Sequence, residues 1–116
     1  MVQYMQHMKR SATSRGEIQR LANRIARAFK PDRVVLFGSH ARGTPSPDSD
    51  VDILVILPFD GKGFVKSLEI MNRIKAPFSL DLIARRPDDT ARRYEQGDPL
   101  IHEALDHGQT LYERRG

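Results

Sequence analysis

The 116-residue sequence contains no cysteine, and this absence removes several classes of function at once. Without thiols the chain forms no disulfides, holds no thiolate zinc site and has no cysteine nucleophile. It also lacks any apolar run near the roughly 18 residues that a membrane-spanning helix needs. The opening MVQYMQHMKRSAT has no continuous apolar core of the kind that a secretory signal peptide requires. We therefore expect no membrane partner and a cytoplasmic location.

Charged residues of both signs are plentiful, with a small excess of basic ones. The formal net charge is +4 and the isoelectric point is about 9.8. This balance is compatible with a polyanionic partner such as a nucleotide or a nucleic acid. The basic residues are scattered rather than clustered, however, which favours solvated helix faces. The length is that of one domain, large enough for one sheet with helices on it.

The first recognisable element is an amphipathic helix. Ser14 and Glu17 have the spacing of a capping box, and apolar residues follow at helical intervals. The helix is expected to end near Lys30, because Pro31 cannot continue it. We expect one domain over residues 14–113, with an N-terminal tail at 1–13 and a C-terminal tail at 114–116.

Further along the chain, helices alternate with short strands. Apolar, β-branched runs predict three strands, and other spacings predict helices. The expected elements are strands at 33–37, 51–57 and 78–84, a helix at 64–74, a helical turn from Asp88 or Asp89, a last helix from Asp98-Pro99 and a short edge strand at QTLYE. This order predicts a small mixed β-sheet flanked by helices, in the α/β or α+β class.

Two aspartates lie two positions apart where the second strand begins. Side chains alternate along an extended chain, so Asp50 and Asp52 project to the same face. Aspartate is depleted in strands, and two close carboxylates repel each other unless a proton or a cation lies between them. Hard oxygen ligands on one face suit Mg²⁺, which combines few carboxylates with substrate phosphates.

A third acid, Asp81, interrupts the otherwise apolar third strand. If that strand lies beside the second, Asp81 approaches the aspartate pair. Three carboxylates would then hold two metal ions, typically about 3.5–4 Å apart, for an in-line phosphoryl displacement. Asp81 could instead take the proton of the attacking hydroxyl. The structural alternative is an edge-strand acid that faces water.

A Gly-Ser turn closes the first strand and supplies the other half of this arrangement. Gly38 permits close backbone approach, and Ser39 begins a short helix whose free N–H groups bind phosphate. Arg42, one turn later, adds a charge-assisted contact, unless it is a surface charge that caps the turn. For His40 a solvated side chain is favoured. A phosphate cradle opposite a carboxylate metal site suits a nucleoside triphosphate.

Two other motifs predict no function. The segment DGKGF at Asp60–Phe64 lacks the four-residue spacer of a phosphate loop and the Ser or Thr after its lysine, so it predicts a turn. His102 and His107 are five positions apart and do not share a helical face, as a metal-binding pair would.

The segment GSHARG, followed by DVD with ten residues between Ser39 and Asp50, resembles the Gly-Ser…Asp-x-Asp signature of the DNA polymerase beta-like nucleotidyltransferases. The small size and the ending DPLIHEALDHGQTLYE are similar to the minimal nucleotidyltransferases, or MNT domains. The resemblance covers roughly residues 15–113. It implies the following roles: phosphate binding by Gly38 and Ser39, metal binding by Asp50 and Asp52, and a third ligand or general base at Asp81.

The resemblance also implies an activity, namely Mg²⁺-dependent transfer of a nucleotidyl group to an acceptor hydroxyl with loss of pyrophosphate. AMP from ATP is the expected group. Many MNT proteins are antitoxins to a HEPN-domain ribonuclease, in some cases because they adenylylate a tyrosine on it. Larger relatives carry a further domain that holds the base and the acceptor. We therefore expect acceptor specificity to come from a partner surface or a second copy of the chain.

Two other functions compete with this one. The chain could be an antitoxin that inhibits a HEPN partner by covering it, with a vestigial nucleotide site. The intact carboxylate set favours the enzyme, since a pure binding protein has no reason to keep repelling acids together. Direct nucleic acid binding through the first helix is disfavoured, because that helix carries no dense basic stripe.

Overall fold

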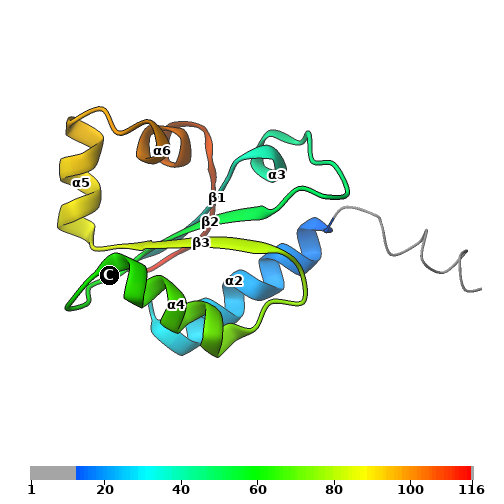
Figure 1. The fold of residues 1–116 in the computed structure, drawn as a ribbon, viewed down its shortest axis with the longest axis horizontal. Coiled ribbons are helices and arrows are strands. Elements are labelled where there is room, and N and C mark those ends of the chain that lie inside the picture. The colour runs from blue at the N-terminus through cyan, green and yellow to red at the C-terminus, as the bar shows by residue number, and fades with distance from the viewer. Residues whose placement is uncertain (1–12, 116) are drawn as a thin grey trace, which may run out of the picture.

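The chain forms a four-stranded mixed sheet with helices on both faces (Figure 1). A computed structural model describes residues 13–115, so all of the predicted N-terminal tail except Thr13 lies outside the described residues. In chain order the elements are α2 (Arg15–Phe29), β1 (Arg33–Phe37), α3 (Ser39–Arg42), β2 (Val51–Ile56), α4 (Gly63–Ile74), β3 (Leu80–Arg85), α5 (Pro87–Glu95), α6 (Pro99–His102), the π-helical turn η1 (Glu103–His107) and β4 (Gln109–Glu113). No helix within residues 13–115 is long and apolar enough to cross a membrane.

The strands lie in the order β3-β2-β1-β4. β1 pairs antiparallel with both β2 and β4, whereas β2 and β3 are parallel. The predicted mixed sheet is therefore confirmed. β3 begins two residues later than predicted, because its partner β2 begins only at Val51, which lies opposite Leu80.

Helix α2 begins as its sequence predicts. The N–H of Glu17 donates to the Ser14 hydroxyl at 3.1 Å, and the N–H of Ser14 donates to the Glu17 carboxylate at 2.9 Å. This capping box satisfies two backbone donors that the helix itself cannot pair. The helix ends at Lys30, whose left-handed backbone stops it before Pro31.

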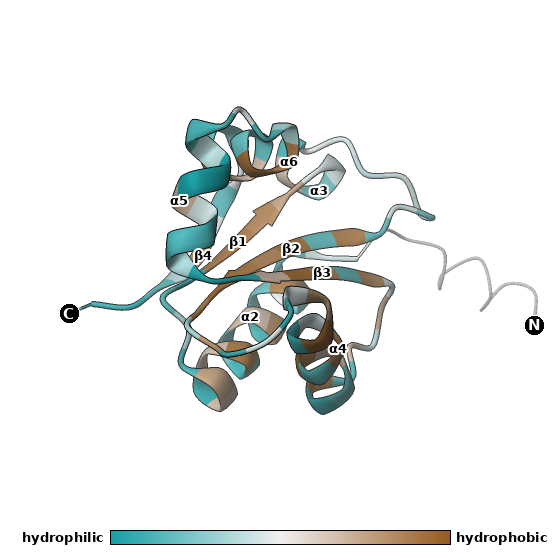
Figure 2. Cartoon of the chain, turned by 60° about the vertical axis from the view of Figure 1, so that its left-hand side comes forward, coloured by the Kyte–Doolittle hydropathy of each residue, from teal (hydrophilic) through white to brown (hydrophobic). Residues whose placement is uncertain are grey.

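Side chains that alternate along the strands pack into two separate cores, one on each face of the sheet. α2 and α4 cover one face, and α6 with η1 covers part of the other (Figure 1). β1 and β2 are apolar along most of their length, as expected of strands buried on both faces (Figure 2). The face below α6 contains Val35, Phe37, Leu54 and Ile56. Residues 50 and 52 have the same parity as Leu54 and Ile56, so the acids continue this second face beyond its apolar part.

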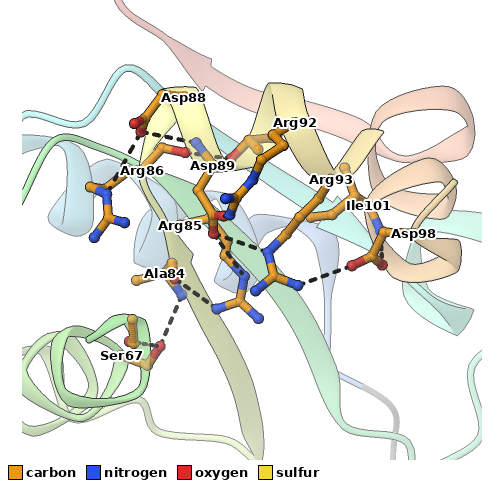
Figure 3. Close-up of polar contacts among 12 residues, drawn as sticks. Ser67, Ala84, Arg85, Arg86, Asp88, Asp89, Arg92, Arg93, Asp98 and Ile101 are labelled. Atoms are coloured by element: carbon orange, nitrogen blue, oxygen red, sulfur yellow. Dashed lines mark hydrogen bonds and ion pairs between the residues drawn. The ribbon is translucent and has the colours of Figure 1, made fainter. Parts of the chain in front are cut away.

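A buried serine ties the edge strand β3 to α4. The N–H of Ala84 donates to the Ser67 hydroxyl at 2.9 Å, and that hydroxyl donates to the carbonyl of Gly63 at 2.8 Å (Figure 3). β3 has a strand neighbour on one side only, so this side chain supplies an acceptor that a further strand would otherwise provide.

We expect Ser67→Ala to lower the free energy of unfolding by about 1–3 kcal/mol, because it leaves the buried N–H of Ala84 without a partner. Urea denaturation measures the change. Asn72→Ala, at an exposed position of the same helix, is the control and should stay within about 0.5 kcal/mol of the parent. Equal stability of the two variants would contradict the role given to Ser67.

Candidate active site

The three aspartates predicted from sequence meet at one end of the sheet. The parallel register places Asp52 directly opposite Asp81, on neighbouring strands whose backbones are about 4.8 Å apart. Asp50 precedes β2 by one residue and accepts a hydrogen bond from the hydroxyl of Ser79, which precedes β3 by one residue. The condition on which the role of Asp81 depended, that β3 lies beside β2, is met.

Asp52 is half-buried among other acids. Burial raises the pKa of Asp52, and the negative charges of Asp81, Asp50 and Glu103 raise it further, whereas His40 lowers it. A carboxylate in such surroundings is stabilised by a proton or by a cation. The donors that surround this point are hard carboxylate oxygens, and this donor set fits Mg²⁺.

The carboxylate of Asp50 is not arranged with those of Asp52 and Asp81 to bind one metal ion. Among residues 13–115, no three His, Asp or Glu side chains are arranged so that they could hold a metal ion as they stand. The carboxylate of Asp50 is engaged with Ser79 instead. Asp50 is exposed, so a change of rotamer that brings it toward Asp52 meets little steric resistance.

Gly38 brings the end of β1 against Asp52. Its φ of 76° and ψ of −156° lie in a region that is essentially restricted to glycine. A Cβ at this position would stand 2.2 Å from Oδ2 of Asp52, a separation that no side chain tolerates. The Gly-Ser turn and the aspartates are therefore adjacent, although the binding of phosphate by the turn stays a prediction.

The single helical turn α3 begins at Ser39, as predicted. The N–H groups of Ser39 and His40 have no acceptor within α3, because the first donors of any helix lack one. Arg42 pairs with Glu103 of η1 at 2.6 Å, so its charge is directed at a carboxylate rather than held ready for a phosphate. The pair is exposed, and such pairs contribute about 1 kcal/mol or less, so a phosphate could compete for Arg42.

His40 is buried, and the expectation that it would be solvated was wrong. Its Nε2 lies 3.4 Å from the carbonyl oxygen of Ser49, so the ring packs beneath the loop that leads to Asp50. The sequence around His40 contains no signal for this burial, because the loop that covers the ring lies nine positions further on. The ring is one of the groups that influence Asp52.

A family model described as a nucleotidyltransferase domain matches residues 18–111. The chain belongs to this nucleotidyltransferase domain family. The family resemblance expected from GSHARG and DVD is thereby confirmed, and the matched residues include all six predicted site positions. No curated protein matches the chain.

Solved structures contain the same fold. A candidate nucleotidyltransferase from Sulfolobus solfataricus has a TM-score of 0.60 and 20% identity, over 85% of this chain and 79% of that one. A toxin–antitoxin complex with AMP-PNP has a TM-score of 0.55 and 20% identity, over 84% and 74%. A mutant of the MntA–HpeT toxin–antitoxin pair has a TM-score of 0.52 and 16% identity, over 84% and 74%. At these identities the likeness concerns the fold.

We predict that Gly38→Ala weakens both the fold and the expected binding of Mn²⁺ by the aspartates. The strained backbone costs about 1–3 kcal/mol, and the new methyl group displaces the carboxylate of Asp52. Gly43→Ala is the control, since Gly43 has a φ of 77° but no described atom within 4 Å of its added Cβ. Urea denaturation and Mn²⁺ titration distinguish the two effects: only Gly38→Ala should lose Mn²⁺ affinity. Retention of that affinity would contradict the packing of Gly38 on Asp52.

The raised pKa of Asp52 predicts a pH-dependent stability. Above its folded pKa the charged carboxylate destabilises the folded state, and this penalty disappears as the pH falls toward 3.8, the ordinary pKa of an aspartate. With EDTA present, Asp52→Asn should therefore raise the free energy of unfolding near pH 7.5 by up to about 1 kcal/mol, the scale of a partly exposed charge interaction. The gain should vanish near pH 4.

Urea denaturation at the two pH values measures this difference. Asp48→Asn, at an exposed position of the loop before β2, is the control that removes one carboxylate outside the site. A loss of stability in Asp52→Asn at neutral pH, or a gain that is independent of pH, would contradict the electrostatic description of the site.

Proposed function

We propose that this nucleotidyltransferase domain transfers AMP from ATP to a hydroxyl group of a protein partner. The observation that carries the proposal is the pairing of Asp52 with Asp81 at the sheet end where Gly38 also approaches Asp52. The aspartates and the Gly-Ser turn are therefore adjacent, which supports a joint role for them. Catalysis of phosphoryl-type transfer depends mainly on such positioning and on charge stabilisation.

Each half of the site has a separate task. The open N–H groups at Ser39 would hold the phosphates of ATP, and the absence of a side chain at Gly38 lets the backbone come close to them. Asp50, Asp52 and Asp81 would hold Mg²⁺, which supplies neutralisation of the triphosphate charge when it is bound. Two such ions are expected for three carboxylates.

The proposed reaction is a displacement at the α-phosphorus of ATP. The oxygen of the acceptor hydroxyl forms the new bond to this phosphorus. The bond from the phosphorus to the bridging oxygen breaks, and pyrophosphate leaves with the electron pair. Asp81 is exposed at the edge strand and would accept the hydroxyl proton if it is not a metal ligand.

We propose a HEPN-domain toxin as the protein that carries the acceptor. Two of the structures with the same fold are toxin–antitoxin complexes, one of which contains AMP-PNP. The resemblance to MNT antitoxins leads to the same partner. β3, which carries Asp81, is an edge strand with no strand on its outer side. The partner protein would present its acceptor hydroxyl at this open edge.

A non-catalytic antitoxin is the second candidate. Two observations favour it: Arg42 is engaged with Glu103, and Asp50 is engaged with Ser79. In that case the chain would inhibit the HEPN partner by forming a complex with it, and the aspartates would at most sense nucleotide.

The test is transfer of label from α-³²P-ATP, with Mg²⁺, to a HEPN-domain protein encoded beside this one, or to proteins of a cell lysate where no such neighbour exists. A denaturing gel shows the labelled band. We expect Asp50→Asn combined with Asp52→Asn to reduce the label by at least about a hundredfold, because the site loses its metal ligands and their charge stabilisation.

Asp48→Asn is the matched control and should label the acceptor as the parent does, since it also removes a carboxylate from the segment before β2. Equal labelling by the double variant would exclude the aspartates from catalysis. An unlabelled partner that nevertheless forms a stable complex would support the non-catalytic antitoxin.

A further inference from the structure

A basic pocket lies at the other end of the sheet from the aspartates. β2 and β3 are parallel, so their first residues, where the acids lie, share one end and their last residues share the other. At that second end the pocket has a volume of about 460 Å³. Its charged lining residues are Lys62, Arg85, Arg86, Arg92, Arg93 and Asp89. Five of these six charged lining residues are cationic.

Asp89 is shared among several of these cations (Figure 3). It accepts hydrogen bonds from Arg92 and, at 3.0 Å, from Arg93, and it lies 4.0 Å from Nε of Arg85. Lys62 makes no ion pair with any of the described residues. Arg86 and Arg93 also pair, at 3.7 and 3.3 Å, with Asp88 and Asp98, which lie beside the pocket. The five cations are thus matched by three carboxylates, so the pocket keeps a net positive charge.

The arginine at the end of β3, Arg85, donates from Nη1 to the carbonyl of Ala84 at 3.0 Å, but its Nε lacks an acceptor among the described residues. In the described part of the chain, Nε of Arg85 is a buried side-chain nitrogen without a hydrogen-bond partner. Burial lowers the pKa of Arg85, and the adjacent charge of Arg93 lowers it further. A buried donor without an acceptor is costly, and an anion in the pocket would reduce the repulsion between Arg85 and Arg93.

Two helices also begin at this pocket. α4 starts after Lys62 and α5 starts after Arg86, and neither start is capped by a described side chain. Gly63, the first residue of α4, packs so closely on β3 that a Cβ there would stand 2.9 Å from the carbonyl of Ala84. The start of α4 presents free N–H groups and a positive dipole end, which attract phosphate. The start of α5 presents fewer, because Pro87 has no N–H and the N–H of Asp89 donates to Asp88.

We propose that this pocket binds a phosphate group, separately from the Mg²⁺-dependent site. Its chemistry fits inorganic pyrophosphate or the phosphate of a nucleotide. Phe64 lies on the wall of the pocket and is 71% exposed, so its ring is open to stacking by a base. In the segment DGKGF, Asp60 and Gly61 bend the chain as predicted, whereas Gly63 and Phe64 already belong to α4. The segment contributes Gly61, Lys62, Gly63 and Phe64 to the pocket.

The test is isothermal titration of pyrophosphate and of AMP in the presence of EDTA. Without Mg²⁺ the aspartates repel anions, so they cannot account for binding. We expect Lys62→Ala combined with Arg92→Ala to weaken binding by at least about tenfold, because both exposed cations would contact the anion. The control, Arg27→Ala combined with Arg115→Ala, removes the same charge from exposed positions elsewhere and should bind as the parent does.

Two further measurements identify the binding site and the ligand. The Nε–Hε NMR signal of Arg85 should shift as pyrophosphate is added, since Arg85 lines the pocket and an anion there changes the electrostatic environment of its guanidinium. Tighter binding of AMP than of pyrophosphate identifies a nucleotide as the ligand, and the reverse order identifies the inorganic anion. Asp50→Asn combined with Asp52→Asn should leave binding unchanged, which separates this site from the proposed transferase. Absence of saturable binding, or equal weakening in both charge-matched variants, would overturn the proposal.

Discussion

The parallel pairing of β2 with β3 is the constraint on which the rest of this structure depends. Its register places Asp52 beside Asp81 at one end and carries both strands to Arg85 and the basic pocket at the other. A slip of one residue would turn both Asp81 and Arg85 to the face that α4 covers. The two apolar cores, one on each face, hold the register in place.

The carboxylates at the acidic end of the sheet destabilise the folded state, and burial of the two apolar cores offsets this cost. Burial and three neighbouring carboxylates raise the pKa of Asp52, so its charge is unfavourable in the folded state. Gly38 adds a backbone conformation that only glycine adopts readily. Features of this kind, which oppose folding locally, are expected where a protein binds a ligand rather than where it only packs.

Features of the structure that depend only on residues close in sequence could be predicted from the sequence. The capping box at Ser14, the strands and the Asp50–Asp52 pair all follow from spacing within a few positions. The burial of His40 and the pairing of Arg42 with Glu103 could not be predicted, because each needs a segment that the fold brings from elsewhere. The basic pocket combines a turn after β2 with the end of β3 and the start of α5. Separately, these segments look like solvated charges.

The most direct test of the account is an NMR titration with Mn²⁺ and a non-hydrolysable ATP analogue. Mn²⁺ replaces Mg²⁺ at oxygen ligands and broadens the amide signals of residues close to it. The account predicts selective broadening at Gly38, Ser39, Asp52 and Asp81, with the signals around Arg85 spared. Broadening centred elsewhere, or none at saturating Mn²⁺ and nucleotide, would contradict the claim that the β2–β3 pairing builds a nucleotide-binding metal site.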